Sequence, residues 1–132
     1  MGGRRVLLVD EDEAALATLA ASLEATGRFT VRAETDPALV RDAARRFRPE
    51  ALVVAAVMSG RDGGSVVEEV RRLRGLDAVP VVFMNSLIDT KVSSLFWGCG
   101  PHAAVAKPVT GRSLAACLDD VLKARDEGDG GR

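Results

Sequence analysis

Short apolar runs alternate with segments of helical periodicity along this chain, and that alternation limits the possible folds more than any other feature. Residues 5–9, 51–57, 80–84 and 103–106 are almost entirely apolar, as expected of strands buried on both faces. Residues 29–33 alternate apolar and polar side chains, which is typical of a half-buried edge strand. Five strands that alternate with helices predict an α/β domain with three layers, in which helices cover both faces of a parallel sheet.

The helical segments have recognisable starts. Apolar residues recur at helical spacing in five segments: 13–26, 37–47, 66–73, 89–98 and 110–125. Asp36, Ser65 and Thr110 stand where N-caps are expected, because their side-chain oxygens can accept from the first free backbone N–H groups of a helix. The chain therefore reads as five consecutive β–α units with right-handed crossovers.

Length and charge restrict the class of protein. A chain of 132 residues corresponds to about one domain, and no separate output domain is expected. Its 47% hydrophobic and 28% charged residues exclude a disordered chain. Lys and Arg number 18 against 19 Asp and Glu, so the formal net charge is −1 and a nucleic-acid partner is not expected.

The termini and the cysteines add further expectations. Only residues 6–9 are continuously apolar near the start, which is too short for a secretory signal or a membrane span, so we expect a cytoplasmic protein without a membrane partner. With two cysteines and a single histidine, a zinc site is not expected. We expect a domain over residues 1–125, followed by a flexible polar tail or the start of a linker at 126–132.

Polar residues follow the predicted strands. Ligands of parallel α/β sheets bind at the carboxyl ends of the strands, near the point where the strand order reverses. In this chain those ends carry Asp10-Glu11-Asp12, Ala55-Ala56, Asn85-Ser86 and Lys107-Pro108. A functional site is therefore expected among these residues.

Four segments, taken together, resemble the receiver domains of bacterial two-component response regulators. They are residues 6–12 with the first strand and its acidic residues, 49–63 with the third strand and its loop, 79–85 with the fourth strand, and 100–108 with the Lys-Pro step. The resemblance covers about residues 4–125, and its weight comes from four segments that occur in the family's order and spacing.

The resemblance implies a fold and a chemistry. The fold is the flavodoxin-like (βα)5 receiver fold with strand order 2-1-3-4-5. The chemistry is transfer of a phosphoryl group from a histidine kinase to an aspartate, with a divalent cation that neutralises the phosphoryl oxygens. By this resemblance Asp10 and Glu11 correspond to the metal-binding acidic pair, and Lys107 corresponds to the lysine that stabilises developing charge.

The chain lacks three of the family's switching elements, and Ser59 stands where the family usually has a proline. Residues 58–63 set the register, and this register puts Ala55 at the position of the phosphoacceptor aspartate. Asn85 stands at the position of the hydroxyl residue, and Ala104 stands where many receivers have a switching aromatic. Because a methyl group can neither be phosphorylated nor bind a metal, the chain is identified as an atypical receiver, or pseudo-receiver.

These departures leave two hypotheses for the pocket. In the first, Lys107 is a counter-ion for Asp10 or Glu11, no cofactor is required, and these two carboxylates bind Mg²⁺ at most weakly. In the second, phosphorylation or Mg²⁺ binding persists through Asp12 or Asp62. The pocket is expected to comprise the acidic residues Asp10, Glu11 and Asp12, together with Asn85, Ser86, Lys107 and Pro108.

A partner surface is expected on one side of the domain. Successive helical residues lie about 100° apart, so the consecutive apolar residues around Leu95 and Trp97 cannot all face the core. With Ala104, they mark a candidate partner face, which the resemblance places on helix 89–98, strand 103–106 and helix 110–125. A protein partner is expected there, and a second copy of the chain is one candidate.

The expected function is therefore signalling by protein contact, independent of phosphorylation and without enzymatic activity. A small-molecule or nucleotide binder is a weaker alternative, because no glycine-rich loop follows the first strand. Arginines at 41–48 and 71–74 are interpreted as solvated helix faces, and docking to an acidic partner or a nucleic acid is the alternative.

Overall fold

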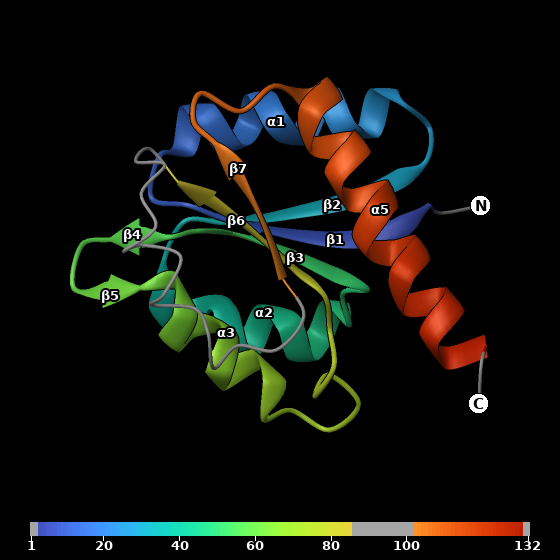
Figure 1. Cartoon of the computed structure of the whole chain (residues 1–132). Coiled ribbons are helices and arrows are strands. Elements are labelled where there is room, and N and C mark those ends of the chain that lie inside the picture. The colour runs from blue at the N-terminus through green and yellow to red at the C-terminus, as the bar shows by residue number, and fades with distance from the viewer. Residues whose placement is uncertain (1–2, 86–101, 131–132) are drawn as a thin grey trace.

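Figure 1 shows the fold of the chain in a computed structural model, which describes residues 3–85 and 102–130. One parallel sheet has the strand order β2-β1-β3-β6-β7. Its strands are β1 (Arg4–Val9), β2 (Phe29–Glu34), β3 (Ala51–Ala55), β6 (Val81–Asn85) and β7 (His102–Ala106). Counted along the chain, these are the five predicted strands in the predicted order 2-1-3-4-5, so the predicted fold class is confirmed.

Helices cover both faces of the sheet (Figure 1). They are α1 (Glu13–Ala25), the 3₁₀ turn η1 (Pro37–Leu39) leading into α2 (Val40–Phe47), α3 (Gly63–Arg71) and α5 (Gly111–Gly130). The helices α1 and α5 lie on one face, and α2 and α3 lie on the other. The predicted helix at 89–98 lies outside the described residues. None of the helices described is long and apolar enough to cross a membrane.

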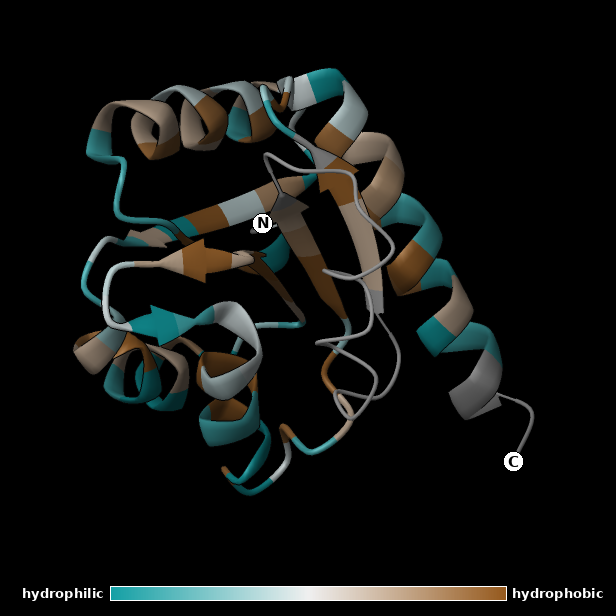
Figure 2. Ribbon diagram, turned by 60° about the vertical axis from the view of Figure 1, so that its left-hand side comes forward, coloured by the Kyte–Doolittle hydropathy of each residue, from teal (hydrophilic) through white to brown (hydrophobic). Residues whose placement is uncertain are grey.

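The sheet separates two hydrophobic cores. Side chains alternate between the faces of a strand, so Leu7 and Val9 pack toward α2 and α3, whereas Val6 and Leu8 pack toward α1 and α5. All four are fully buried, which explains why the strand reads as an uninterrupted apolar run. Figure 2 shows the same pattern as hydrophobic colour along the central strands.

The helix starts follow the predicted caps with one correction. The carboxylate of Asp36 accepts from the N–H of Ala38, at 2.9 Å, and the hydroxyl of Thr110 accepts from the N–H of Ser113, at 3.1 Å. The predicted cap Ser65 is wrong. Its backbone N–H instead donates to the carboxylate of Asp62, at 2.8 Å, so the helix α3 begins three residues earlier. A carboxylate is the better cap, because it also meets the positive end of the helix dipole.

The predicted strand 51–57 ends two residues early. After Ala55 the chain forms a small antiparallel hairpin of β4 (Val57–Met58) and β5 (Arg61–Asp62). Gly60 in its turn has φ +79°, a conformation that glycine adopts without steric cost. Val57 is 70% exposed, so the apolar run continues in sequence but leaves the core.

The last helix is longer than expected. The helix α5 continues to Gly130, past the predicted domain boundary at residue 125. Asp126, which was expected to lie in a flexible tail, is bound by the guanidinium of Arg4, with N–O distances of 3.0 and 3.2 Å. A contact 122 residues away along the chain is invisible to a local reading of composition, which explains the difference.

Candidate functional site

The predicted pocket residues gather at the carboxyl edge of the sheet, on the side of the molecule that carries the β4–β5 hairpin (Figure 1). The chain leaves β1 to form β2 on one side and β3 on the other, which makes this edge the point where the strand order reverses. Ala55 and Asn85 are the last residues of β3 and β6. Among the described residues that follow strands here are Asp10, Glu11 and Asp12 after β1, and Lys107 and Pro108 after β7. Ser86 lies outside the described residues.

Asp10 and Lys107 form an ion pair at the centre of this edge. Asp10 follows β1 and is only 6% exposed, and its Oδ2 lies 2.6 Å from the Nζ of Lys107, which follows β7. Its other oxygen accepts from the backbone N–H of Asp12, at 3.2 Å. The prediction that Lys107 is an internal counter-ion is confirmed for Asp10. Each charge here compensates the other in a region where an unpaired charge would be costly.

The other two acidic residues also have internal partners. The carboxylate of Glu11 accepts a hydrogen bond from the backbone N–H of Ser59, in the turn of the β4–β5 hairpin. The carboxylate of Asp12 caps α1 by accepting from the N–H of Ala15, at 3.0 Å. Sequence reasoning missed the contact with Ser59, because it interpreted residues 58–63 as a loop and did not predict the hairpin that presents this N–H group.

Ala55 ends β3 in the interior. It is 1% exposed, and it is the register partner of Met84 in the neighbouring strand β6. Its neighbour Val54 pairs with Val9, which immediately precedes Asp10. A methyl group therefore stands between the strand that leads to Asp10 and the strand β6. Ala55 and Ala56, at the carboxyl end of β3, carry no side-chain oxygen or nitrogen.

The Asp62–Gly63 step explains a feature of the sequence pattern. The carboxylate of Asp62 caps α3, and Gly63 follows at the start of the helix. A Cβ on Gly63 would lie 2.4 Å from the carbonyl oxygen of Ala55, so only glycine lets the helix approach the end of β3 this closely. Asp62 and Gly63 belong to the segment that aligned Ala55 with the family's acceptor position, and packing against β3 explains why a glycine is required there.

A cavity of about 660 Å³ opens beside the ion pair. It lies between the amino-terminal half of α1 and the segment that follows β7. Its walls are mostly apolar, and Pro108 borders it next to Lys107. The described residues around it are Asp10, Asp12, Ala14, Ala15, Thr18, Leu19, Met84, Lys107, Pro108 and Val109.

The residues present do not fit a tightly held divalent cation. Mg²⁺ prefers six oxygen ligands, and it usually takes one or two carboxylates plus water. One oxygen of Asp10 is bound to Lys107, Glu11 is bound to the hairpin, and Ala55 supplies no ligand. Within residues 3–85 and 102–130, no group of three or more His, Cys, Asp or Glu side chains could hold a metal ion.

The candidate partner face is described in part. Ala104 in β7 is exposed, and β7 is an edge strand of the sheet, as expected for a surface that another protein can reach. Leu95 and Trp97 lie outside the described residues.

On α5, burial and the nearby charge of Asp120 raise the pKa of the Cys117 thiol. Cys117 is half-buried and packs against the core on this face of the sheet, as a small hydrophobic residue would.

The arginine-rich helices are mainly solvated. Arg41, Arg45 and Arg46 are exposed on α2, and Arg45 pairs with Asp42 one turn earlier, at 3.1 Å. Arg71 differs from the predicted solvated face, because its guanidinium donates to the carbonyl of Val79, at 2.9 Å. That bond ties α3 to the segment leading into β6.

Comparisons with known proteins agree with the fold. The model of the response regulator receiver domain family matches residues 6–119 of the chain. The transcriptional regulatory protein PrrA of Mycobacterium tuberculosis is 33% identical over 121 residues, which are 92% of this chain and 51% of that protein. CseB of Streptomyces coelicolor is 29% identical over 126 residues, which are 96% of this chain and 52% of that protein. The chain thus spans about half the length of these curated relatives.

Solved structures of low sequence identity share the fold. The chemotaxis protein CheY4 of Vibrio cholerae has a TM-score of 0.84 at 18% identity, with 91% of this chain and 99% of that chain covered. The receiver domain of the sensor histidine kinase PA1611 of Pseudomonas aeruginosa, which holds a magnesium ion in its active-site cleft, has a TM-score of 0.80 at 21% identity over 92% and 99% of the chains. With a family model that matches most of its length, this chain belongs to the response regulator receiver domain family of two-component signalling.

Proposed function

We propose that this receiver domain transmits its signal through contacts with another protein and without an aspartyl phosphate. The observation that carries the proposal is Ala55, a buried methyl group at the carboxyl end of β3, where the family's acceptor aspartate is expected. Phosphoryl transfer to a protein requires a nucleophilic side chain at the point of attack, and a methyl group has none.

The electrostatics beside Ala55 support the proposal. In a phosphorylated receiver, a lysine at this edge would stabilise the negative charge that develops on the phosphoryl group. Here Lys107 already lies 2.6 Å from Asp10 and compensates its charge. We therefore propose that the pocket keeps one electrostatic state, that it needs no cofactor, and that any Mg²⁺ binding to Asp10 and Glu11 is weak.

The two alternative acceptors have other roles in the fold. The carboxylates of Asp12 and Asp62 cap α1 and α3. Losing a cap costs about 1 kcal/mol, so a phosphoryl group that displaced either carboxylate would weaken the helix behind it. This cost favours a receiver without phosphorylation over one that uses an unusual aspartate.

The proposed partner is a protein that binds the side of the domain formed by β7 and α5, and a second copy of the chain is one candidate. The near-neutral charge of the chain disfavours DNA as its direct partner. PrrA and CseB are named as transcriptional regulatory proteins, so we propose that the output served by this contact is control of transcription. The proposal includes a cytoplasmic location and no catalytic activity.

Intact-mass measurement after incubation with acetyl phosphate and Mg²⁺ tests the missing acceptor. We expect the mass of the wild-type chain to stay unchanged, because no described side chain at the end of β3 can take the phosphoryl group. The Ala55→Asp variant is the positive control, since it restores a carboxylate at that position. A stoichiometric gain of one phosphoryl group by the wild-type chain would overturn the proposal, and loss of that gain in Asp62→Asn or Asp12→Asn would identify the acceptor.

Two exposed alanines on opposite edge strands test the partner face. Ala104 lies on β7 and Ala33 lies on β2, at the other edge of the sheet. If the chain self-associates through the proposed face, Ala104→Arg should raise the dissociation constant about tenfold or more, because a charge would be buried in the interface. Ala33→Arg should leave it unchanged. Sedimentation equilibrium measures both, and equal effects would place the interface elsewhere.

A further inference from the structure

The last turns of α5 continue beyond the hydrophobic core that holds the rest of this helix. Leu114, Ala115, Leu118 and Leu122 of α5 are buried. After Leu122, every helix residue whose exposure is described is exposed or half-buried, although the helix runs to Gly130. Glycines at 128 and 130 also have poor helix propensity. Apolar packing therefore does not explain why residues 123–130 are helical.

Two aspartates on one face of α5 meet two arginines at the amino edge of the sheet. Asp119 and Asp126 are seven residues apart, or about two turns, so they lie on the same side of the helix. Arg28, just before β2, lies 2.9 Å from Asp119, and Arg4, the first residue of β1, binds Asp126. The backbone N–H of Arg4 donates to the carbonyl of Arg28, at 2.9 Å, so both arginines belong to one paired strand edge.

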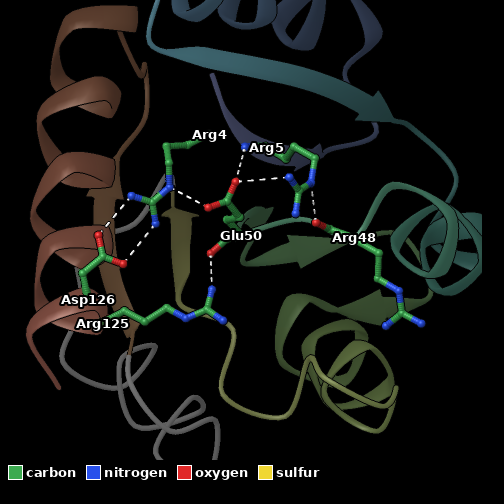
Figure 3. Close-up of polar contacts among 6 residues, drawn as sticks. All are labelled: Arg4, Arg5, Arg48, Glu50, Arg125 and Asp126. Atoms are coloured by element: carbon green, nitrogen blue, oxygen red, sulfur yellow. Dashed lines mark hydrogen bonds and ion pairs between the residues drawn. The ribbon is translucent and has the colours of Figure 1, made fainter. Parts of the chain in front are cut away.

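The guanidinium of Arg4 is bound on all three of its nitrogens, as Figure 3 shows. Its two terminal nitrogens reach the two oxygens of Asp126, at 3.0 and 3.2 Å, and its Nε donates to Glu50, at 2.6 Å. Planar, two-pronged pairing of this kind holds a carboxylate in one orientation better than a single contact does. Arg4 thereby joins α5 to the loop that precedes β3.

Neighbouring groups reinforce this contact. Glu50 also accepts from the backbone N–H of Arg5, at 3.1 Å, and its carbonyl accepts from the guanidinium of Arg125, at 3.0 Å. The hydrogen bonds that Arg4 donates lower the pKa of Asp126, and the same bonds to Asp126 and Glu50 help to raise the pKa of Arg4. Consecutive residues of α5, Arg125 and Asp126, thus both reach the amino edge of the sheet (Figure 3).

We propose that Arg4, Glu50, Arg125 and Asp126 form an ionic clamp that keeps residues 123–130 helical and fixes the direction in which α5 leaves the domain. The two ends of α5 are then held by different forces. Gly111 at its start lies so close to α1 that a Cβ would come within 2.3 Å of Ser22, whereas its last turns depend on charge. The clamp is a conformational device, because salt can release it while the core stays folded.

Hydrogen–deuterium exchange of the whole domain tests the clamp. In Asp126→Asn, we expect the amides of residues 123–130 to exchange about threefold to tenfold faster than in the wild-type chain at low salt. Amides of β1 and β3 should keep their wild-type rates, which separates local opening from global destabilisation. The helix dipole predicts the opposite sign, since removing a negative charge near a helix carboxyl end stabilises the helix.

Glu127→Gln is the matched control. It removes the adjacent carboxylate, whose ion pair with Lys123, at 4.0 Å, stays within α5. We expect its amides to exchange at the wild-type rate or more slowly. At about 1 M salt, where charges are screened beyond roughly 3 Å, the wild-type chain should approach the rate of Asp126→Asn.

Equal exchange in the two variants, or no change in Asp126→Asn, would overturn the clamp. An effect that spread to β1 and β3 would also overturn it, because the contact would then support the whole fold. None of these outcomes bears on Ala55 or on the phosphorylation measurement, so the clamp and the proposed function can fail separately.

Discussion

The two edges of the sheet use charge in different ways. At the carboxyl edge, Asp10 pairs with Lys107 near the end of β3, where Ala55 places a methyl group, and a cavity of about 660 Å³ lies beside the pair. At the amino edge, Glu50 is shared by Arg4 and Arg5, and Arg4 continues to Asp126 on another element. The carboxyl edge compensates charge locally, within the candidate pocket. The amino edge uses charge to connect a strand, a loop and a helix.

The two edges differ in how exposed their ion pairs are, and exposure determines how much each pair contributes to stability. The Asp10 side chain is 8% exposed, so the pair at the carboxyl edge lies where an unpaired charge is costly. Side chains in the amino-edge network are 26% to 58% exposed, so each contact there is weaker and more sensitive to salt. Substitutions at three positions, Lys107, Glu50 and Arg48, test this comparison.

Removal of the Lys107 charge should have the largest effect. In Lys107→Met, the buried carboxylate of Asp10 loses its 2.6 Å partner, and we expect the free energy of unfolding to fall by about 2 kcal/mol. The double variant Asp10→Asn/Lys107→Met should recover part of that loss, because no unpaired charge remains. Urea denaturation measures both. A double variant as unstable as the single one would show that the pair contributes through packing.

Removal of the Glu50 charge should have a smaller effect that depends on pH. Burial raises the pKa of Glu50, but the hydrogen bond from the Arg5 N–H and the contacts with Arg4 together lower it below its ordinary value of 4.5. The stabilisation is therefore complete above pH 4.5 and is lost as the pH falls through the lowered value. We expect Glu50→Gln to cost about 1 kcal/mol at neutral pH and to match the wild-type chain in acid.

Melting temperatures recorded across that pH range check this prediction. Glu24→Gln, which changes an exposed carboxylate of α1, is the control and should show no such convergence. If the difference between Glu50→Gln and the wild-type chain persisted in acid, charge would not be the source of the stabilisation.

Substitution of Arg48 should have the smallest effect. The relative stability of its glycine and alanine variants separates backbone strain from the side-chain hydrogen bond. Arg48 ends α2 with φ 55°, a conformation that costs a non-glycine residue about 1 kcal/mol, and its guanidinium donates to the carbonyl of Arg74, at 2.6 Å. Glycine removes both the strain and the bond, so the stability should change by less than about 0.5 kcal/mol. Alanine keeps the strain and loses the bond, so it should be the less stable variant. The reverse order in thermal denaturation would contradict this account.

Sequence patterns predicted which strands and helices form, and which residues make the pocket. They predicted less well where individual strands and helices begin and end. Continuous apolar runs predicted four of the strands and an alternating pattern predicted the strand at 29–33, while the resemblance to receiver domains predicted the strand order. A pairing of Lys107 with Asp10 or Glu11 was also predicted, because unpaired charges in this pocket would be costly, and the structure shows the pair with Asp10. The hairpin at 57–62 was missed, because Val57 is apolar yet exposed.

The amino-edge network could not have been predicted from the sequence. Its members lie in a strand, a loop and the last helix, and nothing in their local sequence relates them. Asp126 stands among glycines and charged residues, which is a composition typical of flexible segments. Its helical state depends on Arg4, and that contact becomes visible only when the sheet and α5 are assembled. A local reading could identify the pocket because its residues directly follow the strands.

The contact between Arg4 and Asp126 also sets an order of events during synthesis of the protein. The two residues are separated by 122 positions, and ribosomes add roughly 5–20 residues per second, so Arg4 waits on the order of ten seconds before its partner exists. During that interval the start of β1 can pair with β2 and β3, but the amino edge still carries arginines without the α5 carboxylates. Closure of the clamp is therefore one of the last steps by which the nascent domain reaches its final form.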